Sequence, residues 1–186
     1  VLKGMNILFD LGLDKEELME TGLEIGADVP FCICGGTMLA EGVGERLSEL
    51  RAVSGMHLVL VKPYFSVSTK EAYSLVDLNV LSEKERPDTA KLLSYIEEGN
   101  IAKTAESMKN VFELYIGKKY PMIEEIKKEL IKQGALGAVM TGSGSVVFGV
   151  FEDTVLAKKC YETLKKKEFK SKFRQVYLSE FTKGGL

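Results

Sequence analysis

An acidic residue, Asp28, lies between a Gly-Ala pair and a Val-Pro pair in residues 26–31. Pro30 moves the residue before it out of the α region, and Gly26 can end a helix. Asp28 is therefore predicted where the chain leaves a helix and becomes extended, with backbone holding its carboxylate from both sides. This makes Asp28 the candidate catalytic residue. Because Asp beside Gly and Pro is also typical of an ordinary turn, the segment alone leaves both interpretations open.

A second candidate segment, residues 141–145, has the sequence Thr-Gly-Ser-Gly-Ser and joins two apolar runs that predict strands. Glycines let backbone approach a ligand closely, and successive N–H groups beside small hydroxyls can bind anionic oxygens. The candidate phosphate-binding residues are Gly142, Ser143 and Gly144. Turn chemistry alone also explains a Gly-Ser turn, and the loop has neither the lysine of a Walker motif nor the spacing of a dinucleotide-binding loop.

A third candidate segment follows the apolar run at residues 57–62, which Pro63 stops. Ser68 or Thr69 can cap the next helix, whose N-terminus would favour an anion, although capping by itself explains both residues. Tyr73 lies one helical turn after Thr69 on the same face, where its ring could stack on a base.

The composition is that of a soluble globular protein: the 186 residues are 45% hydrophobic and 28% charged, with a net charge of −2. The length allows one domain plus part of another. This charge argues against a nucleic-acid partner, and the lysines of residues 165–172 are expected on a solvated surface. No apolar run predicts a membrane span or a signal segment, so a cytoplasmic location is expected. The three cysteines and His57 lack zinc-ligand spacing, so no metal site is predicted. The cysteines are expected to be reduced core residues and His57 to be structural.

The expected elements of the first part are two helices and a hairpin. Val1 opens a helical pattern without a cap, and Asp14 starts a second helix with Glu17 in a capping box. Residues 31–39 are expected to form a strand with the glycines at 35 and 36 inside it, and residues 41–45 to turn the chain into a second strand at 46–50.

The remaining residues predict an antiparallel sheet with helices on one face. Strands are expected at residues 57–62, on both sides of the 141–145 loop, and at 172–178. Helices are expected after Ser68 and at residues 89–98, 102–114, 121–133 and 153–167. This order of elements predicts an α+β fold.

Several of these segments, taken together, resemble the 4-diphosphocytidyl-2-C-methyl-D-erythritol kinases of the GHMP kinase superfamily. They are Gly-Ala-Asp-Val-Pro-Phe at residues 26–31, Gly-Gly-Thr-Met-Leu-Ala-Glu-Gly-Val-Gly-Glu at 35–45, Lys62-Pro63 with Val67-Ser68-Thr69 and Tyr73, Arg86-Pro87-Asp88, and Met-Thr-Gly-Ser-Gly at 140–144. The resemblance covers nearly the whole chain, and the first two segments are the specific ones.

The resemblance implies transfer of the γ-phosphoryl group of ATP, with Mg²⁺, to the 2-hydroxyl of 4-diphosphocytidyl-2-C-methyl-D-erythritol, in non-mevalonate isoprenoid biosynthesis. Asp28 would accept the hydroxyl proton. Thr69 and Tyr73 would contact the diphosphate and the cytosine of this small-molecule substrate. Gly142 to Gly144 would support the phosphate site.

The resemblance also implies two domains, of which residues 1–54 would be the end of the nucleotide-binding domain. Residues 55–186 would be the substrate-side, ferredoxin-like C-terminal domain. The family's glycine-rich phosphate loop and catalytic lysine would precede Val1, so this chain alone is expected to be inactive and to self-associate through exposed apolar surface.

Two other functions stay open at this point. One is a GHMP kinase with a different acceptor alcohol. The other is a non-catalytic, ferredoxin-like module whose Gly-Ser loop binds an effector.

Overall fold

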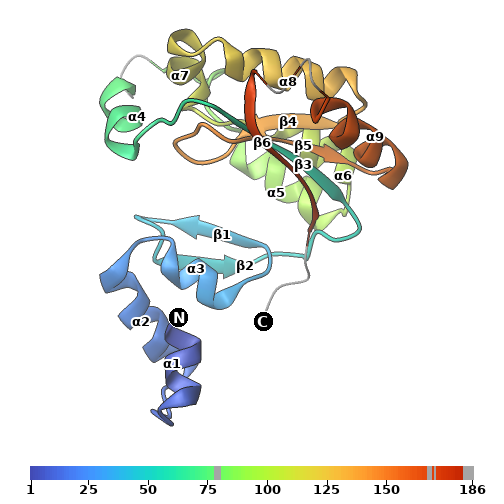
Figure 1. Cartoon of the computed structure of the whole chain (residues 1–186). Coiled ribbons are helices and arrows are strands. Elements are labelled where there is room, and N and C mark those ends of the chain that lie inside the picture. Colours follow the sequence, from blue (N-terminus) through green and yellow to red (C-terminus); the bar gives the residue numbers. More distant parts are fainter. Residues whose placement is uncertain (78–80, 167–168, 170, 182–186) are drawn as a thin grey trace. The chain divides into compact units, whose positions relative to one another are not determined.

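The computed structural model describes residues 1–77, 81–166, 169 and 171–181 (Figure 1). These residues form two compact units, Val1–Ser54 and Gly55–Phe181. No helix of the described chain is both long and apolar enough to cross a membrane.

The first unit contains three helices and a two-stranded hairpin. The helices are α1 (Leu2–Leu8), α2 (Lys15–Ile25) and α3 (Val29–Cys34), and the antiparallel strands are β1 (Met38–Glu41) and β2 (Arg46–Glu49). The capping box predicted at the start of α2 is confirmed, because Asp14 Oδ1 accepts from the Glu17 N–H and Glu17 Oε2 accepts from the Asp14 N–H, each at 2.9 Å.

The expected strand at residues 31–39 is wrong, because its first part is the helix α3. Proline costs no hydrogen bond in the first turn of a helix, and Pro30 lies there. Asp28 is accordingly helical (φ −85°, ψ −10°) rather than extended. The two glycines after Cys34 have positive φ and connect α3 to β1 instead of lying inside a strand.

Helix α1 exposes apolar side chains, as the sequence predicted for the first helix. The exposed residues of its apolar surface and of the turn after it are Met5, Ile7, Leu8, Phe9 and Leu11. Self-association through this surface stays a prediction.

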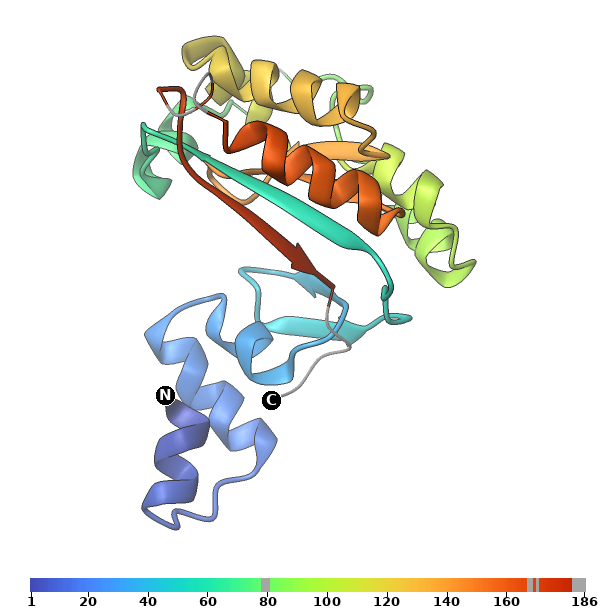
Figure 2. The same ribbon diagram turned by 45° about the vertical axis from the view of Figure 1, so that its right-hand side comes forward.

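The second unit is built on an antiparallel sheet with the strand order β4-β5-β3-β6, which confirms the predicted α+β class. Its strands are β3 (His57–Pro63), β4 (Gly137–Met140), β5 (Val147–Phe151) and β6 (Phe173–Glu180). His57 pairs with Glu180, and the Phe181 N–H donates to the Met56 carbonyl at 3.1 Å. The chain therefore enters and leaves this unit on neighbouring strands (Figure 2).

The helices α8 (Met122–Lys132) and α9 (Thr154–Leu164) cover one face of this sheet (Figure 2). Their inner residues recur at three- and four-residue spacing and are Ile123, Ile126 and Leu130 on α8, and Ala157, Cys160 and Leu164 on α9. They pack on buried residues of the strands such as Val59 and Phe151. Burial raises the pKa of the Cys160 thiol to about 12, so this thiol stays protonated.

The cysteine predictions are partly wrong. All three cysteines are free, and Cys160 is the core residue expected, but Cys32 is exposed and Cys34 half-buried. The reason is that residues 31–34 form the short surface helix α3 instead of a buried strand.

The other helices are α4 (Thr69–Leu75), α5 (Thr89–Glu97), α6 (Ile101–Ser107) and α7 (Glu113–Lys119). The prediction of one continuous helix over residues 102–114 is therefore wrong. The chain leaves the helical conformation at Met108 (ψ 128°), and Asn110 then shapes the turn into α7, because its side-chain oxygen accepts from the Phe112 N–H at 3.0 Å. The last helix ends at Leu164 with Lys165 as its C-cap, so the expected helix over residues 165 and 166 is wrong. Residue 167, like part of the lysine-rich segment 165–172, lies outside the described residues.

Candidate functional site

Asp28 is the N-cap residue of α3 and its side chain is exposed. Its carboxylate makes no capping hydrogen bond, so this group is not used to hold the helix. The position of α3 is fixed by close packing on α2: a Cβ atom on Gly22 would lie 2.8 Å from Val29 Cγ1. The Asp28 backbone is fixed as well, since its carbonyl accepts from the Cys32 N–H at 3.1 Å.

The turn between β1 and β2 lies against the backbone just before Asp28. Gly44 has φ +117°, and a Cβ atom on it would lie 2.9 Å from the Ala27 carbonyl oxygen. Inside the turn, Glu45 Oε2 accepts from the Val43 N–H at 2.7 Å. Hydrogen bonds from backbone N–H groups, those of Glu45 and Val43 first, lower the pKa of the Glu45 carboxyl. The structure thus brings together the two segments that carry the most specific part of the resemblance.

The turn between β4 and β5 is the predicted glycine loop. Gly142 and Gly144 have φ values of +56° and +93°, which L side chains rarely adopt. The Thr141 N–H donates to the Val146 carbonyl at 2.9 Å and the Gly144 N–H to the Thr141 carbonyl at 3.1 Å. Because these two N–H groups are used inside the loop, an anion would have to be bound by others, such as those of Gly142 and Ser143.

The loop is bound to the segment that carries Thr69. Thr69 Oγ1 lies 3.3 Å from Ser143 Oγ. Ser145 is fully buried, donates its hydroxyl proton to the Phe65 carbonyl at 2.7 Å, and accepts from Lys62 Nζ at 3.1 Å. Two of the predicted segments, which are more than 70 residues apart in the sequence, therefore meet in the second unit.

Tyr73 lies on the same short helix as Thr69. Its side chain is exposed (66%), and its ring contacts Phe112 edge-to-face, with centroids 5.0 Å apart and planes at 75°. The predicted cap of this helix is confirmed, since Ser68 Oγ accepts from the Glu71 N–H at 3.1 Å.

Glu71 ties this helix to α7. Its Oε1 accepts from Lys119 Nζ at 2.8 Å and from the Tyr120 hydroxyl at 3.0 Å. The hydrogen bond from Lys119, and then that from Tyr120, lower the pKa of the Glu71 carboxyl, and the same contact raises the pKa of Lys119. These contacts hold the helix that carries Thr69 and Tyr73.

Sequence reasoning missed three residues near the loop: Lys62, Asn110 and Glu113. Asn110 Nδ2 donates to the carbonyls of Met140 and Gly142, and Glu113 Oε1 accepts from the Met140 N–H. Asn110 and Glu113 fell in what the periodicity predicted to be one helix, so only the break at Asn110 could have revealed them. Lys62 belongs to one of the segments that carry the resemblance, but no role was predicted for it.

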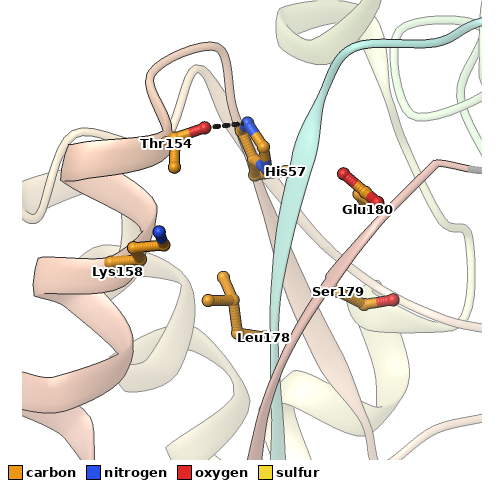
Figure 3. Close-up of a pocket in the computed structure, with 6 residues that line it drawn as sticks. All are labelled: His57, Thr154, Lys158, Leu178, Ser179 and Glu180. Atoms are coloured by element: carbon orange, nitrogen blue, oxygen red, sulfur yellow. Dashed lines mark hydrogen bonds between the residues drawn. The ribbon is translucent and has the colours of Figure 1, made fainter.

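A separate pocket of about 490 Å³ lies beside α9 (Figure 3). Its lining residues are His57, Thr154, Lys158, Leu178, Ser179 and Glu180. None of them is a predicted site residue, and His57 is held by a hydrogen bond to the Thr154 hydroxyl. Within the described residues, no group of three or more His, Cys, Asp and Glu could hold a metal ion.

Comparison with known proteins shows what this chain is similar to. Residues 92–171 match the family model "GHMP kinases C terminal". Among solved structures, a homoserine kinase from Cytophaga hutchinsonii matches with a TM-score of 0.81 at 19% identity, over 97% of this chain and 63% of its own. A 4-(cytidine 5'-diphospho)-2C-methyl-D-erythritol kinase matches with a TM-score of 0.74 at 24% identity, over 98% and 61%. These structural matches show the fold. Residues 92–171 are thus similar to the C-terminal part of GHMP kinases.

The chain is 51% identical to the 4-diphosphocytidyl-2-C-methyl-D-erythritol kinase of Acetivibrio thermocellus over 169 residues, which are 91% of this chain and 59% of that enzyme. It is 47% identical over 186 residues to the enzyme of the same name from Alkaliphilus oremlandii, which is 100% of this chain and 61% of that enzyme. The chain thus spans about three fifths of the length of these relatives.

Proposed function

We propose that the protein containing this chain is an ATP-dependent kinase that phosphorylates the 2-hydroxyl of 4-diphosphocytidyl-2-C-methyl-D-erythritol, in the non-mevalonate route to isoprenoid precursors. The main structural support is the contact between Thr69 and Ser143, at 3.3 Å. This contact joins the segment expected to bind the acceptor's diphosphate to the loop expected to support the transferred phosphate. The identities of 47% and 51% to kinases named for this acceptor support its choice.

In this proposal, Asp28 is the base that orients the acceptor hydroxyl and takes its proton. Phosphoryl transfer needs little covalent chemistry from the protein, so positioning and charge neutralisation dominate. A carboxylate that is exposed, makes no capping bond, and stands on a backbone fixed by α2 and by the β1–β2 turn suits this task.

The glycine loop would stabilise phosphate oxygens through backbone N–H groups. The Lys62 ammonium, 3.1 Å from Ser145 Oγ, adds positive charge at the base of the loop. Mg²⁺ bound to the nucleotide would neutralise phosphate charge.

Tyr73 would stack on the cytosine. A ring that is 66% exposed and supported edge-on by Phe112 can pack its face on a base. Thr69, on the same helix face, would then lie near the diphosphate.

The experiment is steady-state kinetics of Asp28→Asn in the complete gene product. We expect kcat to fall about 100- to 10,000-fold, because a positioned base contributes that much, with an unchanged melting temperature because the side chain is exposed. The matched control is Asp14→Asn, another exposed aspartate of the same unit, where Asn retains the cap and kcat should not change.

The acceptor is tested by comparing 4-diphosphocytidyl-2-C-methyl-D-erythritol with homoserine and mevalonate. A higher kcat/KM for either of the latter would mean a different GHMP kinase. Ordinary turnover by Asp28→Asn would refute the base assignment.

A further inference from the structure

Asn110 uses its whole side-chain amide to hold the turn between α6 and α7 against the glycine loop. Its Nδ2 donates to the Met140 carbonyl at 2.7 Å and to the Gly142 carbonyl at 2.8 Å. Its Oδ1 accepts from the Phe112 N–H at 3.0 Å. An amide has two N–H donors, and each is used on one carbonyl; the reversed orientation would set the oxygen against two other oxygens.

Glu113, three residues further along the chain, binds the other backbone group of Met140. Its Oε1 accepts from the Met140 N–H at 2.5 Å, and its Oε2 accepts from Lys127 Nζ at 2.5 Å. The Glu113 side chain is only 10% exposed, and Lys127 neutralises its charge. Charge-assisted hydrogen bonds to a shielded carboxylate are stronger than neutral ones.

Met140 is the last residue of β4, and β4 is the outer strand of the sheet on this side. The outward N–H and C=O groups of an edge strand have no strand partner. Here both backbone groups of Met140 bind side chains that lie 27 and 30 residues earlier in the sequence. These bonds, together with the one to Gly142, fix the direction in which the loop leaves the sheet.

The same turn reaches the other predicted segment. The Phe112 N–H donates to Asn110 Oδ1. The Phe112 ring packs edge-to-face with the ring of Tyr73, and the two ring centroids are 5.0 Å apart. Residues 110–113 therefore contact both the loop and the aromatic residue expected to bind the acceptor.

We propose that Asn110 and Glu113 are positioning residues for the phosphate-supporting loop, and that Phe112 positions Tyr73 for the cytidine end of the acceptor. The proposal rests on the function proposed above. Asn110 and Glu113 act through Met140 and Gly142 and touch no reacting atom. Errors in the loop position should lower kcat, whereas a displaced Tyr73 should raise the KM for the acceptor.

The first variant is Asn110→Asp in the complete gene product. It preserves shape but sets carboxylate oxygens against two carbonyls, and we expect kcat to fall about 10- to 100-fold, as for a misplaced catalytic group, with the acceptor KM changing less than about threefold. The matched control is Asn100→Asp. Asn100 caps α6 through the Lys103 N–H, and Asp caps equally well, so its kinetics should equal wild type.

Two more variants separate positioning from general stability. Glu113→Gln keeps an acceptor for the Met140 N–H and should retain most of kcat, whereas Glu113→Ala should lose as much as Asn110→Asp. Phe112→Leu should raise the acceptor KM about tenfold and leave the ATP KM and kcat near wild type, because an edge-on ring contact and its orientation are lost. Should Asn110→Asp not fold, Asn110→Ser removes one of the two donors without adding charge and is tested for the same fall in kcat.

An unchanged kcat in the folded Asn110 variant would overturn the positioning role, even while Asp28→Asn still abolished turnover and so supported the kinase. An equal rise in both KM values with unchanged kcat would also overturn it, because that result indicates loosened binding and not a displaced loop. If Asp28→Asn stayed active, the proposed function would fail instead, so the two failures are distinguishable.

Discussion

The turn between β1 and β2 and the turn between β4 and β5 both have two positive-φ glycines one residue apart, yet they are held differently. The first turn is fixed by its own Glu45 and by the neighbouring Ala27 backbone. The second is also fixed by the side chains of Asn110 and Lys62, which lie 32 and 83 residues from the loop residues that they bind. The comparison teaches that the same spacing of glycines can serve a turn held mainly by residues close to it in the sequence or a loop that is also held by side chains distant in the sequence.

Gly44→Ala tests the locally held turn and should have the largest effect on stability. Its backbone has φ +117°, and the new Cβ would lie 2.9 Å from a backbone oxygen that cannot move aside cheaply. We expect a loss of about 2–4 kcal/mol in the unfolding free energy, measured by urea denaturation. The matched control is Gly12→Ala, with φ +67° and nothing within 4 Å, which should lose about 1 kcal/mol from backbone strain. Equal losses would show that the contact with Ala27 is unimportant.

Gly144→Ala tests the distantly held loop and should cost less. Its φ is +93°, but the atom in the way is Met140 Sδ, 2.7 Å from the new Cβ, and a methionine side chain can shift. We expect a loss of about 1–3 kcal/mol, mostly from strain. Gly142→Ala, with φ +56° and nothing within 4 Å, is the comparison and should lose about 1 kcal/mol. A larger loss for Gly142→Ala than for Gly144→Ala would contradict this order.

The smallest effect is expected from two carboxylates, Glu45 in the first turn and Glu71 on the helix whose Thr69 contacts the second. Glu45 and Glu71 both have pKa values lowered by hydrogen bonds, from backbone N–H groups for Glu45 and from Lys119 for Glu71. A lowered folded-state pKa adds stability above the unfolded value of 4.5, and this stability is lost as the pH falls through the folded value. As the pH falls below about 4.5, the folded fraction of Glu45→Gln and Glu71→Gln, followed by circular dichroism, should therefore decrease less steeply than that of the wild type. If the folded fraction of both variants decreased as steeply as that of the wild type, the hydrogen bonds of neither carboxylate would contribute to stability.

Local signals in the sequence predicted much of the fold. The capping box at Asp14, the hairpin around Gly42 and the strand from His57 each depend on residues within a few positions of each other. The failures also have local causes. Proline is compatible with the first turn of a helix as well as with an extended chain, so residues 31–34 were misassigned. The apolar periodicity continued past Ser107, although the chain becomes extended at Met108 and turns at Asn110.

The candidate site was predictable only as separate segments. Glycine spacing and the resemblance singled out Gly142, Ser143 and Gly144, and helix spacing linked Tyr73 to Thr69. The bonds of the loop to Thr69, Asn110 and Glu113 were not predictable, because they depend on which helix lies beside the β4 edge. Such tertiary contacts leave no periodic signal in a single sequence.

The pairing of His57 with Glu180 has a consequence for engineering. Paired residues of an antiparallel ladder have Cα atoms about 5 Å apart, so a short peptide can join the two ends of Gly55–Phe181. A circular permutant of this unit, closed there and opened within the exposed residues 82–88 before α5, would keep every strand pairing of the sheet. The unit could also be inserted into a loop of a host protein. Its two ends are little more than one strand spacing apart, so the two ends of the interrupted host loop would have to separate by only about that distance.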